Sequence, residues 1–203
     1  MSIIWCICMK TKTQLDHLVT SVMRGVAVQT PKRSDAETTA VINIKDIAEG
    51  RIDTTSLERR VITSARHGED ERIQEGDLIV ALRGSQFKAG VADKQASGHF
   101  ITSNLVALRL DLNKVIPEVL AAYLNSPEGQ YILMARSKGT TVPSINQKEL
   151  LSIEVPLLSM ENQQHIRDYL HSTDEYLATL RAEEEIVRKI RDYAIFRSFE
   201  VRA

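Results

Sequence analysis

The C-terminal quarter of the chain constrains the fold most, because it predicts one long helix whose apolar stripe a small domain cannot bury. Ser159 is placed to cap a charged helix that continues to about Phe199. About 39 residues at a rise of 1.5 Å span roughly 60 Å, so packing on its own domain would leave most of the helix uncovered. The stripe repeats every seven residues, with a second set three residues later. Its members are Ile166, Thr173, Leu180, Val187 and Ala194, then Tyr169, Tyr176 and Ile190, with Leu170 and Leu177 widening it and Glu183 interrupting it. We therefore expect a partner helix, in a dimer or bundle.

Length and composition limit the number of domains and the kind of surface that the chain can have. With 203 residues, 43% of them hydrophobic, the chain can form one domain plus the helix, although length alone also allows two small domains. The formal net charge of −1 and the isoelectric point near 6.5 are not those of a strongly basic nucleic-acid-binding protein. Residues 1–150 carry 19 Lys and Arg against 17 Asp and Glu, whereas residues 151–203 carry 7 against 10. An anion-binding surface therefore belongs to the first part.

Both cysteines, Cys6 and Cys8, lie at the N-terminus. A Cys-x-Cys pair cannot build a disulfide framework, and it supplies only half of a four-ligand zinc site. The apolar run Ser2–Met9 lacks a basic leader and is too short for a signal sequence or a membrane span, and no later run is long enough. We expect a cytoplasmic protein in a reducing compartment, with no membrane partner. Residues 1–12 are either a frayed strand or an extension outside the fold.

Short extended segments in the middle of the chain predict a sheet. The strands are expected at Val41–Ile44, Leu78–Leu82, Val91–Ala92, Phe100–Ile101 and Leu105–Leu110, and the unbroken apolar run of the second suits a central strand. Their spacing favours a mixed or antiparallel sheet, and one form that this sheet could take is curled towards a barrel. Two helices, starting at Pro117 and after Ser126, are expected to cover one face, and another is expected over Gln14–Met23. The fold class is thus α+β.

The stretch Lys138–Ser159 joins this domain to the long helix. A polar loop containing Gly139 is followed by Asn146, which predicts a helix start because Glu149 stands where a capping box requires it. Alternating apolar residues then predict a brief strand that stops at Pro156. The domain is expected to cover residues 1–158 and the helix residues 159–203.

Three features resemble the specificity subunits of type I restriction-modification systems. They are Gly76–Ile79 followed by Leu82–Ser85, then Gly139–Asn146 leading into Ile153–Pro156, and then the helix that carries Gln163. Their order and spacing, over residues 40–203, are more specific than any single motif. The resemblance implies a target-recognition domain that reads half of a split DNA site, and a helix that spaces such domains and docks methyltransferase subunits. It implies no catalysis and no cofactor in this chain, with a methyltransferase and a restriction or translocase subunit as partners.

The resembled subunits carry two domain–helix units, whereas this chain has one. A homodimer about a two-fold axis would restore two antiparallel helices with a domain at each end. Two identical readers would then require an interrupted palindrome whose halves lie at least one turn, roughly 34 Å, apart. The alternative hypothesis is an interaction protein that docks on a methyltransferase and regulates or inhibits the complex. The low net positive charge motivates that alternative.

Contacts with double-stranded DNA are predicted for the polar loops. Arg suits guanine and Gln suits adenine, while Lys and Ser suit phosphates, and all four types occur in Arg83–Lys88. Lys94 would lie beside this loop if the intervening strands form a hairpin, and Gly139 permits close approach to a phosphate. The candidates are Arg83, Ser85, Gln86, Lys88 and Lys94, then Lys138, Thr140, Thr141 and Ser144, and a third cluster of Arg59 and Arg60 with Arg66. Since any soluble protein has such loops, the family resemblance carries this prediction.

No catalytic constellation stands out. The run from His67 to Glu71 could hold a metal, but a charged surface loop has the same composition. Nucleotide-binding glycine fingerprints and a nucleophile elbow are absent, as is an Asp/Asn-Pro-Pro-Tyr-type segment for methylating a base. A small hydrolase built on His67 is the third and weakest hypothesis.

Overall fold

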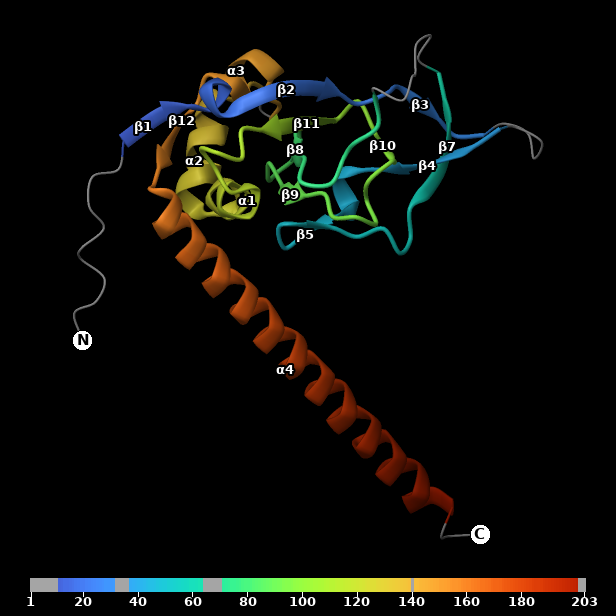
Figure 1. Cartoon of the computed structure of the whole chain (residues 1–203). Coiled ribbons are helices and arrows are strands. Elements are labelled where there is room, and N and C mark those ends of the chain that lie inside the picture. Colours follow the sequence, from blue (N-terminus) through green and yellow to red (C-terminus); the bar gives the residue numbers. More distant parts are fainter. Residues whose placement is uncertain (1–10, 32–36, 64–70, 140, 201–203) are drawn as a thin grey trace. The chain divides into compact units, whose positions relative to one another are not determined.

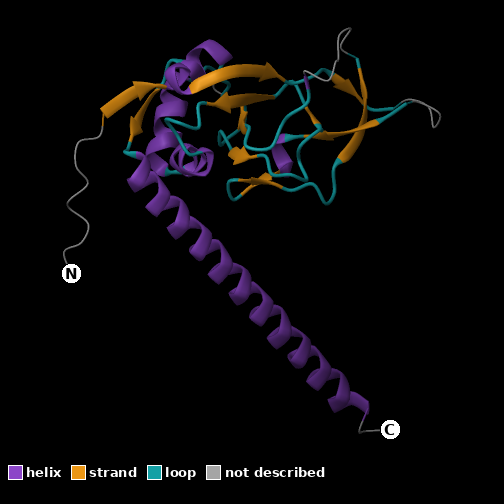
Figure 2. Ribbon diagram, viewed as in Figure 1, coloured by secondary structure: helices purple, strands orange, loops and turns teal. Residues whose placement is uncertain are grey.

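The computed structural model describes residues 11–31, 37–63, 71–139 and 141–200 (Figure 1). The strands are β1 Thr11–Gln14, β2 Val19–Arg24, β3 Val28–Gln29, β4 Thr39–Ile42, β5 Ile47–Ala48, β6 Arg51–Ile52, β7 Glu58–Ile62, β8 Leu78–Ala81, β9 Ala89–Val91, β10 Phe100–Ile101, β11 Leu105–Leu110 and β12 Glu154–Leu157. The helices are α1 Pro117–Asn125, α2 Pro127–Arg136, α3 Gln147–Leu151 and α4 Met160–Glu200, with 3₁₀ turns at Leu15–Leu18 (η1) and Ile44–Asp46 (η2). Figure 2 shows this mixture of strands and helices, which confirms the predicted α+β class.

The described strands form three sheets. The largest has the order β2-β11-β8-β9-β6-β5, the second has the order β10-β4-β7-β3, and β1 pairs with β12. Neighbouring strands run antiparallel except for β6 with β9 and β10 with β4, which are parallel. The mixed pairing is as predicted, but the strands divide among three sheets.

The central strands β8 and β11 carry the core. Successive residues of a strand point to opposite faces, so Leu78 and Val80 pack into one apolar cluster with Leu108, whereas Ile79 and Ala81 pack into another. Both faces of β8 are therefore covered. This explains why the strand is an unbroken apolar run in which every residue is buried.

Helices α1 and α2 cover one face of the largest sheet, as predicted, because Leu120 and Leu133 belong to the same cluster as Leu78. Pro117 begins α1, where its missing N–H costs nothing. Gly129 allows α2 to pack closely, because a Cβ there would lie 2.1 Å from the carbonyl oxygen of Tyr123.

The helix predicted over Gln14–Met23 is wrong. One 3₁₀ turn buries Leu15 and Leu18, and β2 begins at the next residue and pairs with β11. The helical spacing of apolar residues arises from this single turn followed by a strand. The β-branched residues Val19 and Val22 favour the extended form.

The stretch before α4 folds largely as predicted. The Asn146 side-chain oxygen accepts the Glu149 N–H at 2.9 Å, and a Glu149 carboxylate oxygen accepts the Asn146 N–H at 3.4 Å, which confirms the capping box. The strand that follows does not stop at Pro156, because β12 continues to Leu157 and pairs Pro156 with Lys12. Proline is tolerated there because β12 has a strand neighbour on one side only.

The chain divides into two compact units, residues 1–163 and 164–203. The Ser159 hydroxyl accepts the Asn162 N–H at 3.4 Å, and α4 has 41 residues, so the predicted cap and long helix are confirmed. The first turn of α4 belongs to the globular unit because Gln163 is buried there, which places the division later than the predicted boundary after residue 158. Across the described ranges, no helix combines the length and the apolar character needed to cross a bilayer.

Candidate nucleic-acid interface

Two of the predicted DNA-contacting loops lie side by side. Arg83 forms an isolated antiparallel bridge with Ser144, which forms another with Lys138. The Gly84 N–H donates to the Pro143 carbonyl at 3.1 Å, while Lys138 and Ser144 each donate an N–H to the carbonyl of the other at 2.8 Å. Segments far apart in the sequence therefore share one polar surface.

Arg83 is the best-placed cation of this surface. Its side chain is exposed, and within the described part of the chain its guanidinium has no hydrogen-bond or ion-pair partner. Ser85 and Gln86 are exposed beside it. The turn depends on Gly84, whose φ of 131° is rarely adopted by residues with a side chain. The loop thus presents a guanidinium, a hydroxyl and an amide to a ligand.

The two lysines of these loops already have partners. Lys138 Nζ lies 2.8 Å from a Glu149 carboxylate oxygen, and this hydrogen bond raises the pKa of the Lys138 ammonium and lowers the pKa of the Glu149 carboxyl. Lys88 is half-buried, and its Nζ donates to the Ile47 carbonyl at 3.0 Å. A phosphate would have to compete with these contacts. Arg83 is therefore a stronger candidate than either lysine.

Two side-chain amides hold the end of this loop. Gln130 accepts the Phe87 N–H at 3.0 Å and donates to the Phe87 carbonyl at 3.1 Å. Asn125 makes the same pair of bonds with Ala89, at 2.9 and 2.8 Å. The amides thus take the place of a neighbouring strand along one edge of β9 and the residues before it. The sequence alone does not indicate either role, because single Asn and Gln residues on helices are too common to give a signal.

Lys94 does not lie beside Arg83. β8 and β9 form the hairpin that the prediction required, with Leu78 opposite Val91. Arg83 follows the end of β8, whereas Lys94 follows the end of β9, next to where β8 starts. The hairpin therefore places the two cations at opposite ends.

Arg59 and Arg60 form a separate surface on β7. The four-stranded sheet that contains β7 lies at the opposite end of the globular unit from α3 (Figure 1). Arg59 donates to the Thr38 hydroxyl at 3.0 Å, and Arg60 pairs with Glu58. The structure does not bring this cluster together with Arg83.

Some predicted positions cannot be placed. Thr140, Arg66 and His67 lie outside the described residues, whereas Thr141 is described and exposed. In the described ranges, no group of three or more His, Cys, Asp or Glu side chains could hold a metal.

Arg136 and Lys148 are two further exposed cations that flank the loop from Lys138 to Asn146 in the chain, and no sequence pattern indicated them. Both are exposed, and neither has a hydrogen-bond or ion-pair partner within the described ranges. Arg136 ends α2 close enough to Glu149 to help lower the pKa of that carboxyl, although the hydrogen bond from Lys138 is the larger cause. Lys148 lies on α3 directly before Glu149. Within the described residues, Arg83, Arg136 and Lys148 are thus three cations without an ion-pair partner in or next to the two loops.

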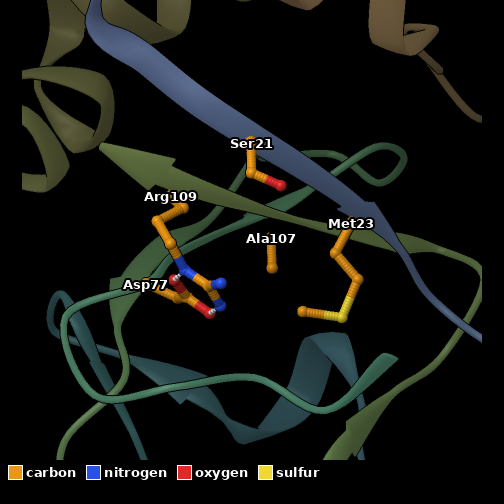
Figure 3. A pocket seen from close by; sticks show the side chains of 5 residues that line it. All are labelled: Ser21, Met23, Asp77, Ala107 and Arg109. Carbon is orange, nitrogen blue, oxygen red and sulfur yellow. Dashed lines mark hydrogen bonds and ion pairs between the residues drawn. The ribbon is translucent and has the colours of Figure 1, made fainter. Parts of the chain in front are cut away.

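The arginine–aspartate pair in the largest sheet is structural. Arg109 donates from Nε and Nη2 to the two carboxylate oxygens of the buried Asp77, at 2.9 Å each. The pair lines a hollow with Ser21, Met23 and Ala107 (Figure 3). Its volume of about 20 Å³ leaves room for about one water molecule, so the hollow is too small for a nucleotide or a base.

Comparison with known proteins identifies the family. The sequence model of the type I restriction modification DNA specificity domain matches residues 14–188, which is most of the chain. The chain belongs to this family. The resemblance inferred from Gly76–Ser85, Gly139–Pro156 and the Gln163 helix is thereby confirmed.

Curated relatives are specificity subunits. The chain is 26% identical over 155 residues to a protein from Methanocaldococcus jannaschii named as the MjaX specificity subunit of a type I restriction enzyme, covering 74% of this chain and 36% of that protein. It is 24% identical over 126 residues to the EcoBI specificity subunit of a type I restriction enzyme from Escherichia coli, covering 62% and 26%. The match thus covers 36% or less of each relative.

Solved specificity subunits have the same fold. The type I restriction-modification S subunit from M. genitalium is similar with a TM-score of 0.60 at 22% identity, over 95% of this chain and 46% of that one. The HsdS subunit from Thermoanaerobacter tengcongensis is similar with a TM-score of 0.58 at 16% identity, over 84% and 43%. In both cases the match covers less than half of the solved subunit.

Proposed function

We propose that the chain is the DNA-recognition subunit of a type I-like restriction-modification complex in the cytoplasm. In this proposal it binds double-stranded DNA, performs no catalysis, and brings an adenine methyltransferase to the site, with a restriction or translocase subunit as a further partner. The family match over residues 14–188 carries the proposal. The unpaired guanidinium of Arg83 supports it, because arginine suits both the guanine edge in the major groove and the phosphate backbone.

The exposed side of α4 supports a homodimer. Large apolar residues on the predicted stripe are between 41% and 72% exposed, namely Tyr169, Tyr176, Leu180, Val187 and Ile190. A row of uncovered aromatic and aliphatic side chains favours association. An antiparallel pair of α4 helices about a two-fold axis would cover the row and put a recognition domain at each end.

One register of this helix pair places the two polar residues of the stripe opposite each other. If Glu183 of one helix faces Thr173 of the other, the axis passes beside Ala178. The other opposed pairs are then Ile166 with Ile190, Tyr169 with Val187, and Tyr176 with Leu180. Apolar residues meet apolar residues in these three pairs, and Thr173 meets Glu183. At 1.5 Å per residue the helix starts lie about 54 Å apart, which is more than one turn of DNA and suits an interrupted palindrome.

The recognition surface can be tested by measuring how well the assembled complex protects DNA at its recognition site. Replacing Arg83 and Gln86 together with alanine is expected to reduce protection at least tenfold, because a bidentate base contact contributes about 1–3 kcal/mol. Lys88 is left intact because it bonds Ile47. Arg59→Ala, which removes an arginine from the separate surface on β7, is measured in the same assay, so that a loss in the double variant alone assigns recognition to the Arg83 loop. Unchanged protection in the double variant would exclude this loop from DNA recognition.

Cross-linking tests the homodimer. In the proposed register, Thr179 lies next to its own copy at the two-fold axis. In a chain that carries Cys6→Ser and Cys8→Ser, Thr179→Cys is expected to link to itself through a short bis-maleimide, and light scattering should give a dimer mass. A monomer at all concentrations would contradict the homodimer.

A second candidate function is regulation or inhibition of a methyltransferase complex. The net charge of −1 favours it, as do the contacts that already occupy Lys138 and Arg60. It would show as tight methyltransferase binding that blocks methylation, with no DNA affinity even in the complex.

A further inference from the structure

A second apolar group lies near the C-terminal end of α4, away from the stripe. Ile195, Phe196 and Phe199 are 51%, 59% and 77% exposed. A helix turns about 100° per residue, so with Ala194 on the stripe these three residues fall on the opposite side. They occupy heptad positions b, c and f, which point outwards from a two-helix pair. The proposed helix pair therefore cannot cover them.

The apolar residues of α4 leave the stripe at the level where the opposing helix begins. In the register that pairs Thr173 with Glu183, Ala194 lies opposite Asn162 of the second copy. Residues 195–199 lie opposite residues 157–161, and α4 starts at Met160. Beyond residue 194 the helix therefore extends past the start of the second copy's α4, to the level of residues 157–161, which belong to its globular unit. Apolar residues leave the stripe at this same point.

The globular unit offers an apolar counterpart near the start of α4. Leu112 is 62% exposed, although most large apolar side chains of that unit are buried. It lies in the turn that connects Asp111 with Lys114, where the Lys114 N–H donates to the Asp111 carbonyl at 2.9 Å. The Lys114 carbonyl accepts a 2.9 Å hydrogen bond from Gln163 in the first turn of α4. Leu112 is therefore two residues from a direct contact with that turn.

We propose that Ile195, Phe196 and Phe199 dock on the globular unit of a second copy, around Leu112. This inference rests on the homodimer proposed above and adds to it two helix–domain contacts related by the two-fold axis. Each recognition domain would then be tied to the other copy's helix as well as to its own. A second copy is favoured as the binding partner because the register places these three residues opposite residues 157–161 of that copy.

A cysteine pair tests the contact in the full chain. With Cys6→Ser and Cys8→Ser present, one copy carrying Leu112→Cys and another carrying Phe199→Cys are expected to form a mixed cross-link with the short bis-maleimide. The matched control replaces Phe199→Cys with Ile186→Cys, which is 57% exposed but lies about 20 Å earlier along the helix. The control pair should not link.

The outcomes separate this inference from the homodimer. If Thr179→Cys links to itself and the Leu112–Phe199 pair does not, the docking contact is wrong and the homodimer stands. If neither links, both are wrong.

A second variant tests the energetic role of the contact. Phe196→Ser with Phe199→Ser is expected to weaken the dimer tenfold or more in dilution measurements, with helix content unchanged by circular dichroism. If it leaves the dimer intact but abolishes binding of a purified methyltransferase subunit, that subunit occupies the face and the proposal is overturned.

Discussion

The side-chain oxygen of Gln163 accepts a 2.8 Å hydrogen bond from the backbone N–H of Ile116, the residue that precedes α1. The nitrogen of the same amide donates to the carbonyls of Lys114 and Leu158, at 2.9 Å each. Gln163 is only 1% exposed. One buried amide thus satisfies three backbone groups and holds the first turn of α4 in the globular unit.

Gln163→Leu tests this arrangement, because leucine cannot form hydrogen bonds with those backbone groups. An unsatisfied buried group costs about 1–3 kcal/mol, so we expect the free energy of unfolding to fall by about 3 kcal/mol, measured in urea. Gln164→Leu, at the exposed neighbouring position, is the control and should have little effect. Equal stability of the Gln163 variant and the natural chain would contradict this role.

Asp77→Asn is expected to destabilise the largest sheet. The change leaves Arg109 without its buried partner, and breaking such a pair costs about 3 kcal/mol at a buried site. The Arg109 side chain is 39% exposed, so water offsets part of the loss and we expect about 2 kcal/mol in thermal unfolding. Asp111→Asn, which breaks the more exposed pair with Lys114, should cost less than about 1 kcal/mol. A similar loss in both variants would argue against a structural role specific to Asp77.

The contact between Lys138 and Glu149 predicts a pH dependence. The hydrogen bond lowers the pKa of the Glu149 carboxyl in the folded chain, so ionised Glu149 stabilises the fold. This contribution is present at neutral pH and is lost as the pH falls through the lowered pKa. Glu149→Gln should therefore melt below the natural chain at neutral pH, and the difference should shrink in acid, at pH values below the ordinary pKa range of a glutamate carboxyl. A difference that is constant with pH would exclude the charge as its cause.

Salt dependence distinguishes the two possible roles of Arg83. If its guanidinium contacts a phosphate, Arg83→Ala should reduce the slope of log affinity against log salt by about 0.9. If it reads a guanine, the slope should hold while discrimination at one base pair relaxes. Binding of the assembled complex to matched and mismatched DNA, titrated with salt, separates these outcomes. No change in either quantity would remove Arg83 from the interface.

The elements that depend on neighbouring residues could be predicted from the sequence. The run Leu78–Ala81, the proline that begins α1, the Asn146 capping box and the long α4 could all be found from neighbouring residues. The segment Gln14–Met23 could not, because a 3₁₀ turn followed by a strand imitates helical spacing, and its pairing with β11 depends on distant residues.

The candidate site was predicted in composition but not in arrangement. Arg83 and Lys138 were both proposed, yet only the fold shows that Ser144 bridges to each of them. Nothing near Lys88 in the sequence indicates that its ammonium bonds the carbonyl of Ile47. Which cations are free depends on contacts between distant segments, and local patterns do not encode them.

The amides of Asn125 and Gln130 also have a consequence for solubility. An uncovered strand edge presents N–H and C=O groups that can pair with the strands of other molecules and start aggregation. β6 pairs with β9 at Val91 only, and these two side chains occupy the backbone groups at Ala89 and Phe87, so those groups cannot pair with a strand of another molecule. Losing the amides would therefore harm the protein most when it is concentrated or newly synthesised, before any partner subunit has bound.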